Sequence, residues 1–143
     1  MSFLYLPFII QGLCMFVDEF YFHEKRGLKT WEKLGHPLDT LTVLICYIYL
    51  LWGPGDLVIY TILSSFSCLF ITKDEFIHSN VCPAREQWLH SLLFLLHPIC
   101  FLSAFLLKEE DQTGFLKIQT LIVVIFMFYQ ALRWSFSWRI RAK

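Results

Sequence analysis

The chain has 143 residues, of which 57% are hydrophobic and only 17% are charged, and its formal net charge is zero. A soluble domain usually has about half apolar and about a quarter charged residues, so this composition argues against an ordinary water-soluble protein. The length is that of a single domain. Only a short basic tail would attract nucleic acid, and we expect no nucleic-acid partner.

Five apolar runs follow one another along the chain. A helix needs roughly 20 residues, and at least about 17, to cross a bilayer. The runs reach this length when the polar residues at their ends join the helices, and no run alternates with the period of two that marks a strand. We therefore predict one all-α transmembrane domain over residues 1–143, a bundle with helices near 3–22, 37–52, 57–75, 87–107 and 115–133.

The first run is predicted to stay in the mature protein. A cleaved signal peptide has a basic start and a cleavage site of small residues. Residues 1–17 contain no Lys, Arg or Ala.

The basic residues predict an orientation. With five helices, the segments 23–36, 76–86 and 134–143 lie on the same side of the membrane. That side holds ten Lys and Arg residues, counting the helix ends, and the other side holds only Lys108 and Lys117. Cytoplasmic loops carry such an excess, so we predict an integral membrane protein with the N-terminus outside and the C-terminus in the cytoplasm. The tail 134–143 mixes Trp with Arg and is expected to lie on the inner surface, held by anionic lipid.

One polar pattern occurs twice, as "VDEFYFHEKRGLKTWEKLGHPLDT" at 17–40 and as "KDEFIHSNVCPAREQWLH" at 73–90. Each copy has an acidic pair followed by Phe, then a His, then a Glu four residues before another His. Each copy also joins two predicted helices. The repeat therefore predicts two helical hairpins, over about 3–52 and 57–107, related by a pseudo-two-fold axis along the membrane normal, with 115–133 as a fifth helix.

The five His residues of the chain all fall within these copies or just after them. Residues three or four apart share a face of a helix. Glu75 and His78 have the Glu-x-x-His spacing of di-iron carboxylate bundles. His97 follows His90 by seven residues, two helical turns and about 10 Å deeper. The predicted metal ligands are Glu19, His23, His36, Asp39, Glu75, His78, Glu86, His90 and His97.

Other interpretations of the same residues stay open. The side chains can form a buried ionic network that locks the hairpins together without metal. Asp18 and Asp74 can be solvated while Glu19 and Glu75 point inward. Cys82, near His78, is a candidate ligand as well. The five cysteines are odd in number and contain no CxxC, which disfavours a disulfide framework or a thiol-redox enzyme.

Imidazoles mixed with carboxylates suit iron, manganese or zinc. The ligands outnumber the three or four that one zinc ion takes, so they predict two divalent ions, with iron favoured. The chain lacks the HxxxH and HxxHH boxes of membrane desaturases and hydroxylases. The likeness to di-iron bundles is therefore one of class only, and no further cofactor is predicted.

The predicted function is that of a di-iron oxidoreductase at the cytoplasmic membrane face, of the oxygenase or desaturase type. Its partners would be membrane lipid, a hydrophobic small-molecule substrate and a redox donor. A zinc-dependent lipid hydrolase is an alternative, with Glu86 or Asp39 as general base beside a metal-bound water. A non-catalytic metal-binding protein and a haem protein with two His ligands are the remaining alternatives, although haem leaves the repeated carboxylates unexplained.

Overall fold

The computed structural model describes the backbone of residues 3–141 and the side chains of residues 3–76 and 78–134. Every regular element in this described part is a helix, which confirms the all-α prediction. Five helical segments are long and apolar enough to cross a membrane, over 3–26, 30–52, 57–81, 84–109 and 113–134. By length and composition the chain therefore fits a membrane-spanning bundle.

The first and third segments are each built from several helical elements. The first contains η1 (Phe3–Tyr5), α1 (Leu6–Val17), a π-helical turn η2 (Asp18–His23) and α2 (Glu24–Arg26). The second is α3 (Thr30–Trp52). The third contains α4 (Leu57–Ile71), a 3-10 turn η3 (Thr72–Asp74) and α5 (Glu75–Val81). The fourth and fifth are α6 (Ala84–Glu109) and α7 (Thr113–Arg141).

The helices extend further at one end than predicted. The segments 23–36 and 76–86, predicted as loops, are helical except at 27–29 and 82–83. Polar side chains in these segments face one another inside the bundle, so the backbone satisfies its hydrogen bonds by continuing the helix. Gly27 ends the first segment with φ of 76°, a conformation that glycine adopts without strain.

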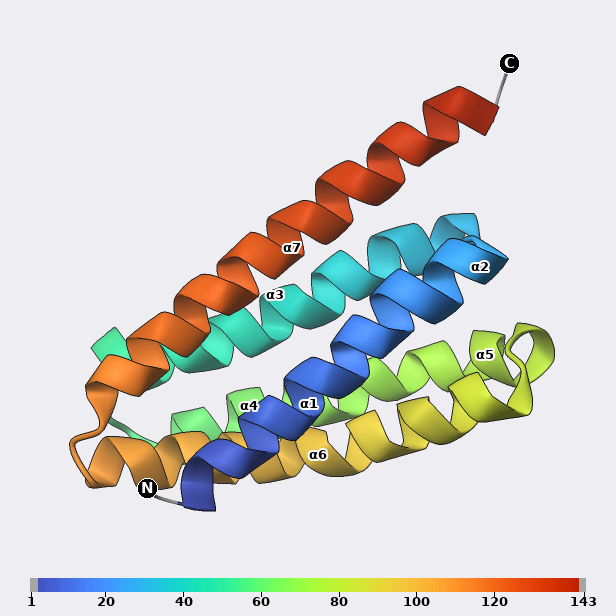
Figure 1. The fold of residues 1–143 in the computed structure, drawn as a ribbon. Helices are drawn as coiled ribbons and strands as arrows, with labels where there is room; N and C mark the ends of the chain where they lie inside the picture. Colours follow the sequence, from blue (N-terminus) through green and yellow to red (C-terminus); the bar gives the residue numbers. More distant parts are fainter. Residues whose placement is uncertain (1–2, 142–143) are drawn as a thin grey trace.

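The helices pack in a definite order. Helix α1 lies against α6, α6 against α4, α4 against α3, and α3 against α7 (Figure 1). Asp56 caps the start of α4 after the Gly53-Pro54-Gly55 connection, because its Oδ1 accepts hydrogen bonds from the backbone N–H groups of Val58 and Ile59. Short connections of this kind keep consecutive helices antiparallel.

The two ends of the bundle have different interiors. We call the end near residues 18–40 and 72–90 the polar end and the other end the apolar end. The apolar end holds a hydrophobic core of Phe8, Cys46, Tyr47, Leu50, Tyr60, Cys100, Phe101, Ala104, Leu107 and Leu116. Outside the bundle, large apolar side chains are exposed, with Leu69 at 71% and Leu13 at 62%. An apolar exterior of this kind suits a lipid solvent.

Helix α7 continues past Trp134 to Arg141 and projects beyond the other helices (Figure 1). The predicted interfacial tail covers 134–143. Residues 142–143, and the side chains from 135 onward, lie outside the described residues, so the placement of the tail on the membrane surface stays a prediction.

Candidate metal centre

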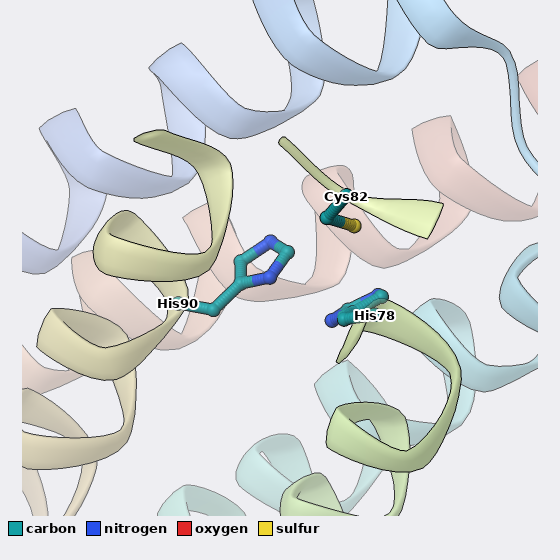
Figure 2. Close-up of side chains that lie close together, drawn as sticks. All are labelled: His78, Cys82 and His90. Atoms are coloured by element: carbon teal, nitrogen blue, oxygen red, sulfur yellow. The ribbon is translucent and has the colours of Figure 1, made fainter. Parts of the chain in front are cut away.

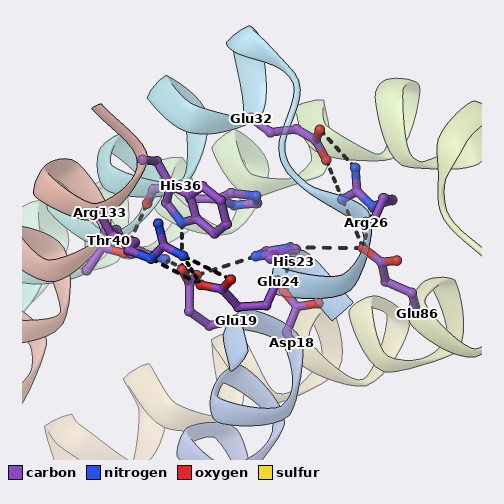
Figure 3. A network of polar contacts seen from close by, with 12 residues as sticks. Asp18, Glu19, His23, Glu24, Arg26, Glu32, His36, Thr40, Glu86 and Arg133 are labelled. Atoms are coloured by element: carbon purple, nitrogen blue, oxygen red, sulfur yellow. Dashed lines mark hydrogen bonds and ion pairs between the residues drawn. The ribbon is translucent and has the colours of Figure 1, made fainter. Parts of the chain in front are cut away.

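The polar end gathers charged and imidazole side chains inside the bundle. Eight of them are at most 7% exposed: Asp18, Glu19, His23, Glu32, Asp74, His78, Glu86 and His90. They come from four helical segments, and Figure 3 shows part of the network they form. Ionisable groups are costly to remove from water, so a buried cluster of this size is a candidate functional site.

A π-helical turn positions two of these side chains. The first copy of the repeat reads "DEFYFH", one residue longer than "DEFIH" in the second copy. The extra residue lies within η2, and a π turn accommodates one additional residue per turn. As a result Asp18 and His23, five residues apart, share a face, with Oδ2 and Nε2 separated by 3.2 Å. Single π turns of this kind occur frequently at functional sites.

Helix α3 positions Glu32 and His36 in two ways. The Glu32 carboxylate accepts a hydrogen bond from the backbone N–H of Lys29, the residue that precedes the helix, which fixes the carboxylate over the first turn. One turn later, a Cβ on Gly35 would lie 3.3 Å from Asp74 Oδ1. The absence of a side chain at Gly35 therefore allows η3 to approach α3.

Ion pairs at the polar end cross between the two predicted hairpins. His90 Nε2 lies 3.0 Å from Asp18 Oδ1. His78 Nε2 lies 3.4 Å from Glu32 Oε1. Two longer pairs also join the hairpins, His36 with Asp74 at 3.8 Å and His23 with Glu86 at 4.0 Å. Each of these four pairs joins a residue before position 40 to a residue after position 73, so neither half is complete alone.

Four imidazole rings lie close together, each near two of the others. Ring centroids are 4.7 Å apart for His23 and His36, 6.1 Å for His36 and His78, 4.2 Å for His78 and His90, and 6.5 Å for His90 and His23. Three buried ring nitrogens have neither a hydrogen-bond nor an ion-pair partner among the described residues: His36 Nε2, His78 Nδ1 and His90 Nδ1. Buried polar atoms are normally paired, so these nitrogens are free to bind a ligand.

Two cations enter the cluster. Arg26 contacts Glu32 through Nη1 at 3.0 Å and Nη2 at 2.6 Å, and it contacts Glu86 Oε1 through Nη2 at 2.9 Å (Figure 3). Lys73 contacts Asp39 and Asp74. The described carboxylates of the cluster are Asp18, Glu19, Glu32, Asp39, Asp74 and Glu86. Six carboxylates against two cations leave four formal negative charges.

Four groups of side chains have the proximity that metal ligation needs. Within each group, one ligand atom per residue lies within 4.8 Å of the others. The groups are Asp18, His23, Glu86 and His90; Glu32, His36 and His78; His36, Asp39 and Asp74; and His78, Cys82 and His90. Bonds from zinc to His or carboxylate ligands are about 2.0–2.2 Å long, so two ligand atoms of one ion lie at most about 4.4 Å apart. Small side-chain rotations therefore suffice to close these groups around an ion.

Figure 2 shows the group that contains the one thiol among them, Cys82 beside His78 and His90. Cys82 lies between the helical segments 57–81 and 84–109. Burial, followed by a hydrogen bond to Glu86, raises the pKa of the Cys82 thiol above its usual value. Without a cation at this position the thiol is therefore protonated, and protonated thiols bind metal poorly.

Not all of the predicted ligands reach these groups. Glu19 is buried, but its oxygens accept hydrogen bonds from Trp134 Nε1 at 2.6 Å and Gln130 Nε2 at 3.3 Å. Glu75 is exposed and belongs to no group. His97 lies apart from the other four imidazoles, where Nε2 pairs with Ser67 Oγ at 3.0 Å and Nδ1 with Gln11 Nε2 at 3.4 Å. The predicted residues that belong to the groups are His23, His36, Asp39, His78, Glu86 and His90.

The open interpretation with solvated aspartates and inward-pointing glutamates does not hold at the second copy. Asp74 is buried and Glu75 is exposed, whereas the interpretation with solvated aspartates required the reverse. Asp18 is also buried, together with Glu19. The signal lay in the spacing. Asp74 is four residues before His78 and thus on its face of the helix, and Glu32 has the same spacing from His36.

A cavity of about 340 Å³ adjoins the cluster. The four stacked imidazoles line it at the polar end, and it continues between α1 and α7 along apolar side chains such as Phe16, Ile122 and Phe126. Ligand sites usually measure about 300–1,000 Å³ and are mostly apolar with a few polar groups. The cavity has this size and composition.

Comparisons of the chain with protein-family models, with curated proteins and with solved structures found no match. Function is therefore inferred from the chemistry of the site.

Proposed function

We propose that the protein is an integral membrane oxidoreductase that holds two divalent metal ions at the polar end of the bundle and acts on a lipid or other hydrophobic substrate. Iron is the favoured metal, and zinc and manganese are the other candidates for such ligands. The observation that carries the proposal is a cluster of six carboxylates with only two cations, beside imidazole nitrogens that have no partner.

Two divalent ions would balance this charge. Bringing carboxylates together away from water is unfavourable unless cations compensate them, and Arg26 and Lys73 compensate only two of the six. Neutral imidazoles add ligands without adding negative charge. Protonation of all four stacked imidazoles is the competing way to reach neutrality, and it would place four cations within a few ångströms of one another, where they repel.

The ligand groups support two ions rather than one. The group of Asp18, His23, Glu86 and His90 contains the two imidazoles that the group of Glu32, His36 and His78 does not. Both groups take residues from both predicted hairpins. In this proposal the polar pattern occurs twice because each hairpin completes both ion sites. The free energy of metal binding would then hold the hairpins together.

The apolar cavity favours a hydrophobic substrate. It brings lipid-facing helix surfaces and the imidazole cluster into one continuous space. Redox-active ions at its polar end would face whatever apolar group fills it. A protein that only stores or senses metal has no need of such a space.

A zinc hydrolase remains the second candidate because Asp39 and Glu86 both lie in ligand groups. Lys73 contacts Asp39 and Arg26 contacts Glu86, however. In this structure each candidate base would therefore have to act from within an ion pair.

Metal identity and oxygen reactivity test the proposal. The protein, purified without chelator, is reconstituted with ferrous iron in the absence of oxygen and then exposed to air. We expect near-ultraviolet or visible absorption to develop and oxygen to be consumed. A colourless protein that retains zinc but binds no iron would contradict the redox proposal and favour hydrolysis.

Neighbouring carboxylates provide a matched control. Asp74→Asn removes a buried group in contact with His36 and Lys73, whereas Glu75→Gln changes an exposed one. We expect Asp74→Asn to lower the bound metal and Glu75→Gln to leave it unchanged. Equal metal content in the two variants would contradict the assignment of the cluster.

The proposed orientation places the polar end at the cytoplasm, which Cys82 can test. It is the only cysteine outside the five membrane-crossing segments. In intact cells a membrane-impermeant maleimide should leave Cys82 unlabelled, and labelling should follow slowly after the inner face is opened, since its raised pKa keeps it protonated. Cys82→Ser supplies the background. Labelling from outside would invert the orientation.

A further inference from the structure

The first helical segment (3–26) and α7 contact each other at two levels and separate between them, where α1 faces α7. At the apolar end, the Phe115 ring lies 4.5 Å from Tyr5 and 5.3 Å from Phe8, measured between centroids. Towards the polar end, the rings of Phe20 and Tyr129 are 5.3 Å apart. Between these contacts, residues of both helices line the 340 Å³ cavity instead of packing together.

The walls of this gap face outward as well as inward. Phe16 on α1 and Ile122 on α7 line the cavity, yet they are 59% and 53% exposed. Gly12 also lines it, and a Cβ built there would meet nothing within 4 Å. The cavity therefore opens sideways, between the two helices, through a window framed by the aromatic contacts at either end.

The window lies within the apolar length of both helices. Gly12 precedes Asp18 by six residues, which places it about 9 Å from the cluster along the helix. Ile122 precedes Gln130 by eight residues, about 12 Å. In a bilayer the window would open to lipid chains rather than to water or to headgroups.

We infer that the cavity between α1 and α7 binds one acyl chain of a membrane phospholipid, which enters sideways from the bilayer and lies against the imidazole cluster. This inference names the substrate class for the proposed function and rests on it for the chemistry, although binding of the chain itself requires no metal. A phospholipid acyl chain is the proposed occupant because acyl chains surround the protein at this depth of the bilayer.

The side chains that line the cavity fit such an occupant. Met15, Leu93 and Phe94 supply apolar contacts, and Met adapts to irregular shapes. The charged groups and four imidazoles gather at one end of the space, where His23, His36, His78 and His90 line it, and Gln11, Gln119 and His97 are polar lining residues further along. A chain in the cavity would thus have methylene groups along the walls and one segment beside the proposed ions.

Photo-crosslinking tests the inference on the full chain. The protein is placed in phosphatidylcholine and phosphatidylglycerol vesicles that contain a phosphatidylcholine with a diazirine in one acyl chain, and adducts are located by mass spectrometry. We expect adducts on residues 11–16 and 119–126 to exceed those on the exposed side chains Ile45, Ile48 and Leu95, which do not line the cavity, by about tenfold, the ratio that 1.4 kcal/mol of preferential binding gives. Uniform labelling of the lipid-facing surface would overturn the inference.

Matched variants test whether the excess labelling depends on the window itself or on any added side chain. Gly12→Phe fills the window, whereas Gly114→Phe adds the same ring at an exposed helical glycine that also has open space and does not line the cavity. Gly12→Phe should remove the excess labelling, and Gly114→Phe should retain it. Ile122→Trp fills the window from the opposite wall and serves if Gly12→Phe does not fold.

Metal content is measured on the same samples, which separates the two proposals. Excess labelling that persists in a protein without metal supports the chain site and contradicts the metal centre. Stoichiometric metal with uniform labelling, or equal labelling of the Gly12→Phe and Gly114→Phe variants, contradicts the chain site and leaves the metal centre standing.

Discussion

The two ends of the bundle differ in the side chains they bury and in the partners of those side chains. At the apolar end the hydroxyls of Tyr60 and Thr120 donate to nearby carbonyls, Tyr60 Oη to that of Phe101 at 2.8 Å and Thr120 Oγ1 to that of Leu116 at 2.7 Å. At the polar end the carboxylates outnumber the Arg and Lys side chains that pair with them, and three imidazole nitrogens lack partners. Lipid provides no hydrophobic drive for helix association, so tight packing must hold the apolar end together. The polar end carries features that packing alone does not require, and it is there that function is expected.

Loss of Arg26 should produce the largest change in stability. Arg26→Met leaves Glu32 and Glu86 without their cation, and removal of one partner from a buried ion pair costs about 3–5 kcal/mol. Unfolding followed by tryptophan fluorescence measures the effect. Arg133→Met is the control, because Arg133 pairs with Glu24 where both are well exposed, and such pairs contribute less than about 1 kcal/mol. Similar losses in the two variants would mean that the polar end is no more than a solvated surface.

A change in the apolar core should separate stability from metal binding. Ala104 is fully buried, and Ala104→Leu overpacks the core at a cost of about 1–3 kcal/mol. The proposed ions are at the other end, so metal per folded chain should stay at the wild-type value. Leu102→Ala, on the exposed side of the same helix, should change neither quantity. Metal loss in Ala104→Leu would show that the two ends are coupled.

The smallest effect is expected from removal of the extra residue in the π turn. Deletion of Tyr21 converts "DEFYFH" to the length of "DEFIH" and should turn η2 into an ordinary helical turn that keeps the Asp and His on one face. Metal content should therefore stay near the wild-type value. Deletion of Leu13 in α1 is the control, since it rotates the preceding helix by about 100° relative to the cluster. Loss of metal after deletion of Tyr21 would contradict this account of the π turn.

The sequence predicted the five helices well and their ends poorly. Apolar runs identify the segments because lipid requires continuous helix. The runs end where polar residues begin, and at Glu32 and His78 those residues are helical and turn inward, which hydropathy does not detect. The pseudo-two-fold relation of the hairpins and the single domain stay predictions.

The meeting of the imidazoles was predicted from the sequence, but several of their partners were not. Four of the five His residues do meet at one end, as the repeat predicted. Arg26 was counted only as a marker of orientation, yet it bridges Glu32 and Glu86. The contact between Arg26 and Glu86 joins residues 60 positions apart, so spacing within one helix cannot reveal it. His97 shares a face with His90 but points to Ser67 and Gln11, because α4 and α1 supply polar partners there.

Metal stoichiometry tests the central claim most directly. The wild-type protein, produced with iron, manganese and zinc available and purified without chelator, should carry close to two ions per chain. His36→Ala and His90→Ala each remove a ligand from the four stacked imidazoles and should lower both the metal content and the melting temperature, whereas His97→Ala, outside the ligand groups, should retain the ions. A wild-type protein without stoichiometric metal, whose His36→Ala and His90→Ala variants melt as it does, would contradict the metal centre and leave the cluster as a buried ionic network.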